Sequence, residues 1–367
     1  MARTTILVMI DGLDPEYLDA CPTPNLRRFI EEGFHVPGGG MMPSVTNVNN
    51  TSMVTGHYPA LHGIVSNYWL DRRAGIEQYV ESGEFICSDT IFDQCRRNGG
   101  RSLLAASKDK LRRLLGTGTD LAFSSEQPTA EAIAASGQPP PIYSLEVNGW
   151  TINSARDALL REHYDLAFIA TTDYAMHAYG PHHPESVRHL AILDETLGRL
   201  FNDVPDVQLL ITADHGMSDK RRMLHLPAVL AQHGISAQAV PVIKDLYVVH
   251  HSNLGGCIYV HLDDPAAIDD AIGVLRETDG VEEALPRETA AAQFSLMPER
   301  LGDILVTGAS DVVFGDPAEI TLPLGLRSHG SRHETSVPII GCGGDFGGFE
   351  FRENCDLGRY VSQRVLN

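Results

Sequence analysis

The chain has 367 residues, of which 43% are apolar and 21% charged, enough to bury one large core or a core with a smaller appended domain. This composition excludes disordered, collagen-like and miniature proteins. Acidic residues outnumber basic ones by 48 to 28, and the net charge of −20 repels nucleic acid because no basic patch offsets it. We therefore expect no nucleic-acid partner.

The six cysteines are scattered along the chain without a Cys-x-x-Cys pair, which favours buried, reduced thiols in a cytoplasmic protein. The apolar run Ile6–Ile10 is followed by Asp11, so it is too short for a signal-peptide core or a membrane span. We expect a cytoplasmic protein without a membrane partner. The sequence leaves the oligomeric state open, a homodimer included.

Short apolar runs alternate with helical patterns along the chain, which is typical of a parallel sheet covered by helices on both faces. The clearest predicted strands are Thr4–Ile10, Ser102–Ala106, Leu166–Thr171, Val207–Thr212 and Val337–Cys342. One helix is predicted after Thr23, with Pro24 at its first position and Gly33 past its end, and another begins at Pro184. The sequence therefore predicts an α/β fold with a mostly parallel central sheet.

From about residue 236 to about residue 310 the pattern changes to strand, strand, helix, strand, strand. The predicted elements are Leu246–His250, Cys257–Leu262, Ala266–Arg276, Gly280–Leu285 and Ile304–Thr307. We interpret residues 236–310 as a small α+β cap inserted late in the main domain. The main domain would then comprise residues 1–235 and 311–367.

Residue types that bind metals follow three of the predicted strands. Asp11 ends the first, and Asp214 with His215 ends the fourth. Asp173 ends the third and precedes His177 by four residues, which would place both on one helical face. A single Asp at such a place more often caps a turn, but the carboxyl ends of parallel strands line one crevice, so all five can converge. Imidazole and carboxylate ligands suit zinc, manganese or iron, and two adjacent ions suit phosphoryl chemistry.

Two further components of such a site each have two candidates. His329 and His333 stand close together, and one of them could complete a second metal site. In residues 42–56, a polar stretch begins a helix whose positive amino end would attract an anion, and Thr46 would lie there as a metal-binding nucleophile. The alternative is that Thr46 or Ser44 is an ordinary helix cap.

Lys108 and Lys110 follow the second predicted strand. A lysine-rich stretch of this kind is usually a solvated helix face. The carboxyl end of a strand, however, would direct these cations into the same crevice as the metal ligands, where they could bind an anion.

Together these segments resemble the alkaline phosphatase superfamily, in its nucleotide pyrophosphatase/phosphodiesterase branch, and most closely the family of phosphonoacetate hydrolases. The resemblance is carried by VMIDG, MPSVTNVNNTSMVTG, HGIVSNYW, SKDKLRRLLG, TTDYAMHAY, ITADHGM, YVVHHSNLGG and LRSHG. It implies the alkaline-phosphatase-like fold and a metal-dependent hydrolase that cleaves the carbon–phosphorus bond of phosphonoacetate to acetate and phosphate.

The resemblance also implies two zinc ions per chain, for which manganese or iron could substitute. The implied ligands are Asp11, Thr46, Asp214 and His215 for one ion, and Asp173, His177 and His329 for the other. The Ser-His-Gly context selects His329 over His333. Thr46 would be the nucleophile, and Asn67 would donate to an oxygen of the phosphorus group. The residues implied to bind the small anionic phosphonate are Thr46, Asn67, Lys108, Lys110 and His215.

Two alternative functions remain open. A phosphodiesterase, nucleotide pyrophosphatase or phosphomonoesterase would use the same metals on an ester, but the lysine pair argues against it. A sulfatase is disfavoured because no Cys-x-Pro-x-Arg stretch is present. A catalytically inactive metal- or anion-binding protein is less favoured, because every ligand position and Thr46 are filled.

Overall fold

The centre of the computed structural model, which describes residues 3–72, 74–247 and 250–367, is a seven-stranded sheet with the order β2-β17-β8-β1-β7-β5-β6. The strands are β1 (Thr4–Met9), β2 (Phe34–Gly39), β5 (Ser102–Ala106), β6 (Leu121–Ser124), β7 (Leu166–Ala170), β8 (Val207–Thr212) and β17 (Ser336–Cys342). Pairing from β8 through β6 is parallel, whereas β17 runs antiparallel to β8 and β2. The predicted fold class is confirmed, and the five predicted strands end within one residue of the observed bounds.

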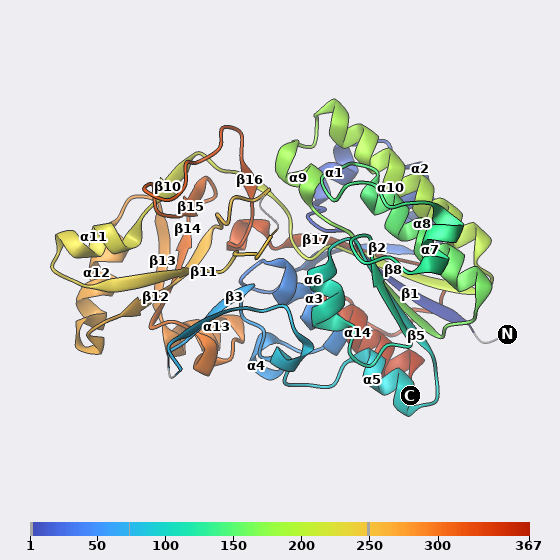
Figure 1. The fold of residues 1–367 in the computed structure, drawn as a ribbon, viewed down its shortest axis with the longest axis horizontal. Helices are drawn as coiled ribbons and strands as arrows, with labels where there is room; N and C mark the ends of the chain where they lie inside the picture. Colours follow the sequence, from blue (N-terminus) through green and yellow to red (C-terminus); the bar gives the residue numbers. More distant parts are fainter. Residues whose placement is uncertain (1–2, 73, 248–249) are drawn as a thin grey trace.

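Helices cover both faces of this sheet (Figure 1). The helices against one face include α1 (Pro15–Ala20), α2 (Pro24–Glu32), α8 (Val147–Arg161) and α10 (Pro184–Asp203), and those against the other include α3 (Thr46–Thr55), α5 (Ile91–Arg97), α6 (Asp109–Leu115) and α14 (Asp356–Tyr360). In β1, Ile6 and Val8 pack into the apolar core under α1, α2, α8 and α10, while Leu7 and Met9 pack into the core on the opposite face. Burial on both faces explains why this strand is a continuous apolar run. The helices predicted after Thr23 and at Pro184 are present.

A second sheet, of four antiparallel strands in the order β11-β12-β14-β13, lies beside the central one (yellow to orange in Figure 1). Its strands are β11 (Ala237–Pro241), β12 (Cys257–Leu262), β13 (Val281–Pro286) and β14 (Ile304–Gly308), and its helices are α11 (Leu226–Gln232), α12 (Ile268–Glu277) and α13 (Arg287–Phe294). Leu226 and Leu230, upstream of residue 236, share its apolar core. The division of the chain into a main domain and a cap at 236–310 stays a prediction.

The predicted strand Leu246–His250 is wrong for its described residues, and Val248 and Val249 lie outside them. Leu246, Tyr247 and His250 form bends or turns, and β11 is the strand that pairs with β12. The Tyr247 hydroxyl accepts from the Lys110 N–H of α6 at 3.3 Å and donates to the Glu126 carboxylate at 2.9 Å, so this segment reaches toward α6 and does not join the sheet. Polar side-chain contacts here override the β-propensity of the sequence.

Shorter elements complete the fold. They are α4 (Pro59–His62), α7 (Ala130–Ser136), α9 (Tyr174–Ala178), β3 (Tyr68–Asp71), β4 (Ile76–Tyr79), β9 (Ser218–Asp219), β10 (Arg222–Leu224), β15 (Val312–Phe314) and β16 (Arg327–Ser328). All six cysteines are free, but Cys87 is exposed, contrary to the expectation that all are buried. In the described part of the chain, no helix has the length and apolar character needed to cross a membrane.

Candidate active site

The carboxyl ends of three adjacent strands bring the predicted acidic residues together. β1 pairs with both β7 and β8, so Asp11 lies between Asp173 and Asp214. Two hydrogen bonds fix these ends, since the Asp11 N–H donates to Thr171 Oγ1 at 2.8 Å and the Gly12 N–H donates to Asp214 Oδ1 at 3.2 Å. The three carboxylates are buried, as the convergence of parallel strand ends predicts.

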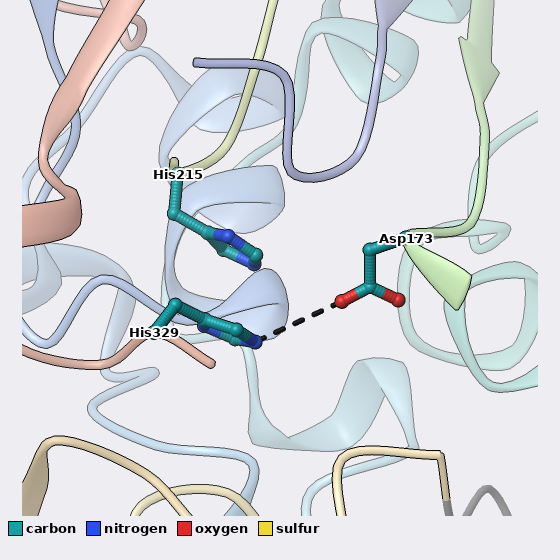
Figure 2. Close-up of side chains that lie close together, drawn as sticks. All are labelled: Asp173, His215 and His329. Atoms are coloured by element: carbon teal, nitrogen blue, oxygen red, sulfur yellow. Dashed lines mark ion pairs between the residues drawn. The ribbon is translucent and has the colours of Figure 1, made fainter. Parts of the chain in front are cut away.

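Three histidines join this cluster: His215 directly follows Asp214, His177 lies on the helix that Asp173 caps, and His329 comes from the segment after β16. Asp173 is the N-cap of α9, and one turn later His177 places its Nε2 2.9 Å from Asp173 Oδ2. Figure 2 shows the rings of His215 and His329 stacked in parallel, with Asp173 facing them; the ring centroids are 3.4 Å apart. His329 Nε2 lies 3.7 Å from Asp173 Oδ2. Three groups in this cluster could hold a metal ion, with ligand atoms within 4.8 Å of one another: Asp11–Asp214–His215, Asp173–His215–His329 and Asp173–His177–His250.

Each of the three predicted histidine ligands is anchored through Nδ1. The Nδ1–H groups donate to backbone carbonyl oxygens of Arg327 (2.5 Å from His177), Gly216 (3.0 Å from His215) and Ser44 (2.7 Å from His329). A neutral imidazole held in this way presents a lone pair on Nε2, and metal-binding histidines are usually held by such a bond. The protein therefore directs three lone pairs toward the carboxylates.

Two carboxylate oxygens support the same interpretation. Asp11 Oδ1 and Asp214 Oδ2 are buried and have no hydrogen-bond partner among the described residues. His215 Nε2 lies 3.5 Å from the first and 3.4 Å from the second. Buried acceptors that face one another are costly unless a cation lies between them. The donor set of carboxylate oxygens and imidazole nitrogens thus fits divalent metal ions.

Burial and mutual repulsion disfavour the ionised forms of two of these carboxylates. Burial raises the pKa of Asp11, and the nearby Asp173 and Asp214 raise it further. Burial also raises the pKa of Asp214 to about 6. For Asp173, burial raises the pKa, but Lys108 and His177 outweigh it, so the pKa lies well below its usual value. The arrangement favours positively charged occupants.

Thr46 is the first residue of α3, and its Oγ1 lies 3.4 Å from His215 Nε2. The alternative that Thr46 or Ser44 caps this helix is wrong: Val45 is the N-cap, and its side chain makes no capping bond. The Ser44 hydroxyl instead donates to the Ser331 carbonyl at 2.6 Å. The Thr46 hydroxyl is therefore placed at the metal cluster and at the positive end of a helix.

Asn67 and Lys108 approach the cluster from two other segments. The Asn47 N–H donates to Asn67 Oδ1 at 3.2 Å, which leaves the amide NH₂ of Asn67 as the group that can donate to an anion. Lys108 Nζ lies 2.6 Å from Asp173 Oδ1 and 3.3 Å from Asp11 Oδ2. Burial lowers the pKa of Lys108, but these two carboxylates raise it more, so the ammonium stays charged.

Lys110 is also buried, so the interpretation of this stretch as a solvated helix face is wrong. Its Nζ donates to both carboxylate oxygens of Asp245, at 2.7 and 2.6 Å. Asp245 belongs to the segment between β11 and β12, and its Oδ2 also lies 2.9 Å from His251 Nε2. Lys110 thus already has one carboxylate partner within the protein.

Sequence reasoning missed Asp245, His250 and His251. His250 Nε2 lies 2.9 Å from Asp173 Oδ1, and its ring centroid lies 4.9 Å from that of His177. The adjacent histidine pair was the signal available, but the pattern favoured a strand there, whose alternation would have separated the two side chains. His333 is outside the cluster, with its Nε2 2.9 Å from Glu282 Oε2, whereas His329 is inside it.

The model of the type I phosphodiesterase/nucleotide pyrophosphatase family matches residues 5–332. The chain belongs to this family. Phosphonoacetate hydrolase from Sinorhizobium meliloti 1021, solved in complex with phosphonoformate and with phosphonoacetate, is 30% identical with a TM-score of 0.90, over 100% of this chain and 96% of that one. Murine ectonucleotide pyrophosphatase/phosphodiesterase 5, at 18% identity and a TM-score of 0.73 over 98% of this chain and 94% of that one, shares the fold.

Curated members of the family are similar over part of their length. An uncharacterized pyrophosphatase/phosphodiesterase of Schizosaccharomyces pombe is 29% identical over 62% of this chain and 49% of its own. Venom phosphodiesterase of Naja atra is 26% identical over 58% of this chain and 26% of its own. The chain thus spans about half or less of the length of these curated relatives.

Proposed function

We propose that this chain hydrolyses the carbon–phosphorus bond of phosphonoacetate to acetate and phosphate at a dinuclear zinc site. The observation that carries the proposal is the pair of lysines, both 1% exposed, beside the ligand cluster. Asp173 and Asp245 balance the charge of these buried ammonium groups, whose remaining N–H bonds could bind a substrate carboxylate, whereas the organic group of an ordinary ester offers no second anion. The similarity to a phosphonoacetate hydrolase over the whole chain supports the same substrate.

The metal ligands that we propose fall into two sets. Asp11, Thr46, Asp214 and His215 would hold one ion, and Asp173, His177 and His329 the other. Zinc bound there would supply Lewis-acid stabilisation of the phosphonate oxygens and lower the pKa of a hydroxyl group or a water molecule. Two ions per chain and a cytoplasmic location are part of this proposal as inferences from the sequence, which leaves the oligomeric state open, a homodimer included.

The chain's own residues account for the chemistry at phosphorus. Thr46 Oγ1 would lose its proton to water, attack phosphorus and form a phosphothreonine, while the amide of Asn67 donates to a phosphonate oxygen. The breaking carbon–phosphorus bond leaves its electron pair on carbon as the enolate of acetate, which water protonates to acetate. Water then hydrolyses the phosphothreonine, which releases phosphate and restores Thr46.

The lysines would act at the other end of the substrate. The enolate places additional negative charge on the carboxylate oxygens as the bond breaks. Lys108 and Lys110 are fixed by their contacts with Asp173 and Asp245, so they offer preorganised positive charge where this charge develops. Because the charge is larger in the transition state than in the substrate, the lysines should raise kcat as well as favour binding.

A substrate panel tests the proposal. The zinc-loaded chain should release phosphate from phosphonoacetate far faster than from methylphosphonate, which lacks the carboxylate, and faster than it cleaves bis(p-nitrophenyl) phosphate. Rapid cleavage of the diester without turnover of phosphonoacetate would instead favour the phosphodiesterase alternative. No turnover of any substrate, with metal bound, would favour an inactive binding protein.

A further inference from the structure

Lys220 and Glu334 form an ion pair deep in the protein, outside the proposed ligand set. Lys220 Nζ lies 3.0 Å from Glu334 Oε1, and both side chains are 0% exposed. The Lys220 ammonium also donates to the Ser310 carbonyl at 2.8 Å. Burying two charges costs several kcal/mol for each ion, and well-packed apolar residues are often at least as stabilising. The pair therefore calls for an explanation other than stability.

The carboxylate of Glu334 organises the turn that carries His329. Glu334 Oε2 accepts hydrogen bonds from the Ser331 N–H at 2.9 Å and from the Ser331 hydroxyl at 2.7 Å. The Ser331 carbonyl in turn accepts from the Ser44 hydroxyl at 2.6 Å, and that hydroxyl accepts from the Gly330 N–H at 3.0 Å. The turn is thereby joined to the segment just before Thr46.

The same network holds the rings of two ligand histidines. The Ser44 carbonyl accepts the Nδ1–H of His329 at 2.7 Å, which fixes the tautomer and direction of that ring. The Gly216 N–H donates to the Glu334 carbonyl at 2.7 Å, and Gly216 also accepts the Nδ1–H of His215 at 3.0 Å. Glu334 thus contacts the segments that place His329 and His215, and Ser331 joins it to the segment that places Thr46.

We propose that Glu334, with its charge balanced by Lys220, is a positioning residue for the metal centre. It holds the three segments that carry metal ligands in fixed positions relative to one another, so that the stacked rings of His215 and His329 face Asp173. The inference rests on the metal centre of the proposed function and is independent of the substrate. A charged acceptor suits this role, because hydrogen bonds to a carboxylate are stronger and more directional than those to a neutral group.

The test compares metal release from two matched variants. Glu334→Gln keeps the size of the side chain and removes its charge. Asp194→Asn makes the same change at another buried carboxylate, which accepts from the Leu26 N–H at 2.8 Å and from the Asn25 N–H at 3.1 Å, and so joins α10 to α2 away from the ligand segments. Both variants should lower the melting temperature of the zinc-loaded protein, since each weakens a buried network.

Only Glu334→Gln should change the rate at which zinc is released. Both zinc equivalents should transfer to a chromogenic chelator at least about tenfold faster than from the wild type, because His329 and His215 belong to different ligand sets. Tenfold is the lower end of the effect of removing a residue that supports a ligand. Asp194→Asn should release zinc at the wild-type rate. Wild-type release rates in both variants, with only the melting temperature lowered, would reduce Glu334 to a stabilising residue and overturn the inference.

A second variant covers the case in which Glu334→Gln does not fold. Ser44→Ala removes the hydroxyl that links the turn to Thr46 without leaving a buried charge unpaired, and it should also speed release of one equivalent. An unchanged rate in Ser44→Ala would overturn the inference. A wild type that binds no zinc would overturn both this inference and the metal centre, whereas a zinc-binding wild type inactive on phosphonoacetate would contradict only the proposed substrate.

Discussion

The two ends of the candidate site are built differently. At the ligand end, Asp11, Asp173 and Asp214 stand at the ends of adjacent parallel strands, so sheet topology alone brings them together. At the lysine end, Lys110 at the start of α6 contacts Asp245, which belongs to the long segment between β11 and β12. The first end depends on regular structure, and the second on a loop that reaches across from another sheet. We expect the ligand end to serve any phosphorus substrate and the lysine end to select one.

The largest effect should come from the nucleophile at the ligand end. Thr46→Ala should lower kcat for phosphonoacetate and for p-nitrophenyl phosphate alike, by at least about 10³-fold, because the attacking oxygen is lost for both. Thr55→Ala is the matched control, since its hydroxyl donates to the Thr51 carbonyl at 2.8 Å and accepts from the His57 N–H at 3.3 Å, at the other end of the same helix. A Thr46→Ala variant that loses only one of the two activities would break the expected division between the ends.

The next largest effect should come from the loss of a ligand histidine. His329→Ala should lower the affinity for one of two zinc equivalents by more than the roughly 10- to 100-fold expected when a supporting residue is lost. His333→Ala should keep both, since His333 contacts Glu282 outside the cluster. Elemental analysis after dialysis against a weak chelator measures both. Equal metal loss in the two variants would contradict the assignment of His329, and not His333, as a metal ligand.

Substitutions of the two lysines should distinguish the functions of the two ends of the site. Lys110→Met should cost about 2–4 kcal/mol in kcat/KM for phosphonoacetate, as for loss of a preorganised charge-stabilising donor, and leave p-nitrophenyl phosphate nearly unchanged. Lys108→Met should slow both substrates, because Lys108 also contacts Asp11 and Asp173. Lys244→Met is the control, at a lysine that is 32% exposed. An equal loss on both substrates in Lys110→Met would make that lysine structural.

This difference between the ends also explains what could be predicted from the sequence. The order of strand, acidic residue and helix predicted where Asp11, Asp173, Asp214 and His215 lie, because a parallel sheet allows few arrangements of its strand ends. The contact of Asp245 with Lys110 joins residues far apart in the sequence through a loop. No periodic pattern encodes such a contact, and the apolar residues of that segment favoured a strand.

The last prediction concerns stability and not activity, at the residues that support the ligand end. Asn148 donates to the Thr172 carbonyl at 2.8 Å, next to Asp173, and its amide lies 3.5 Å from Nε2 of buried His189. Burial lowers the pKa of His189 to about 4. Between the ordinary value of about 6.5 and this one, the unfolded chain binds a proton that the native protein does not, so the free energy of unfolding should fall by about 3 kcal/mol as the pH drops through this window.

His189→Asn should flatten that dependence. The slope of unfolding free energy against pH between pH about 6.5 and 4 should decrease by up to about 1.4 kcal/mol per pH unit, the contribution of one proton. Denaturant unfolding of both proteins across this range measures the slope, and groups that they share cancel in the comparison. An unchanged slope would mean that His189 titrates normally in the folded protein.

The most direct test of the proposed function is to measure whether the carbon–phosphorus bond of phosphonoacetate is cleaved. Phosphonoacetate labelled with ¹³C would be incubated with the zinc-loaded chain and followed by ³¹P and ¹³C NMR. Hydrolysis at the proposed site predicts equimolar phosphate and acetate, with no product in the Thr46→Ala variant. Unchanged phosphonoacetate, in a preparation that binds zinc and cleaves phosphate esters, would contradict the proposed function.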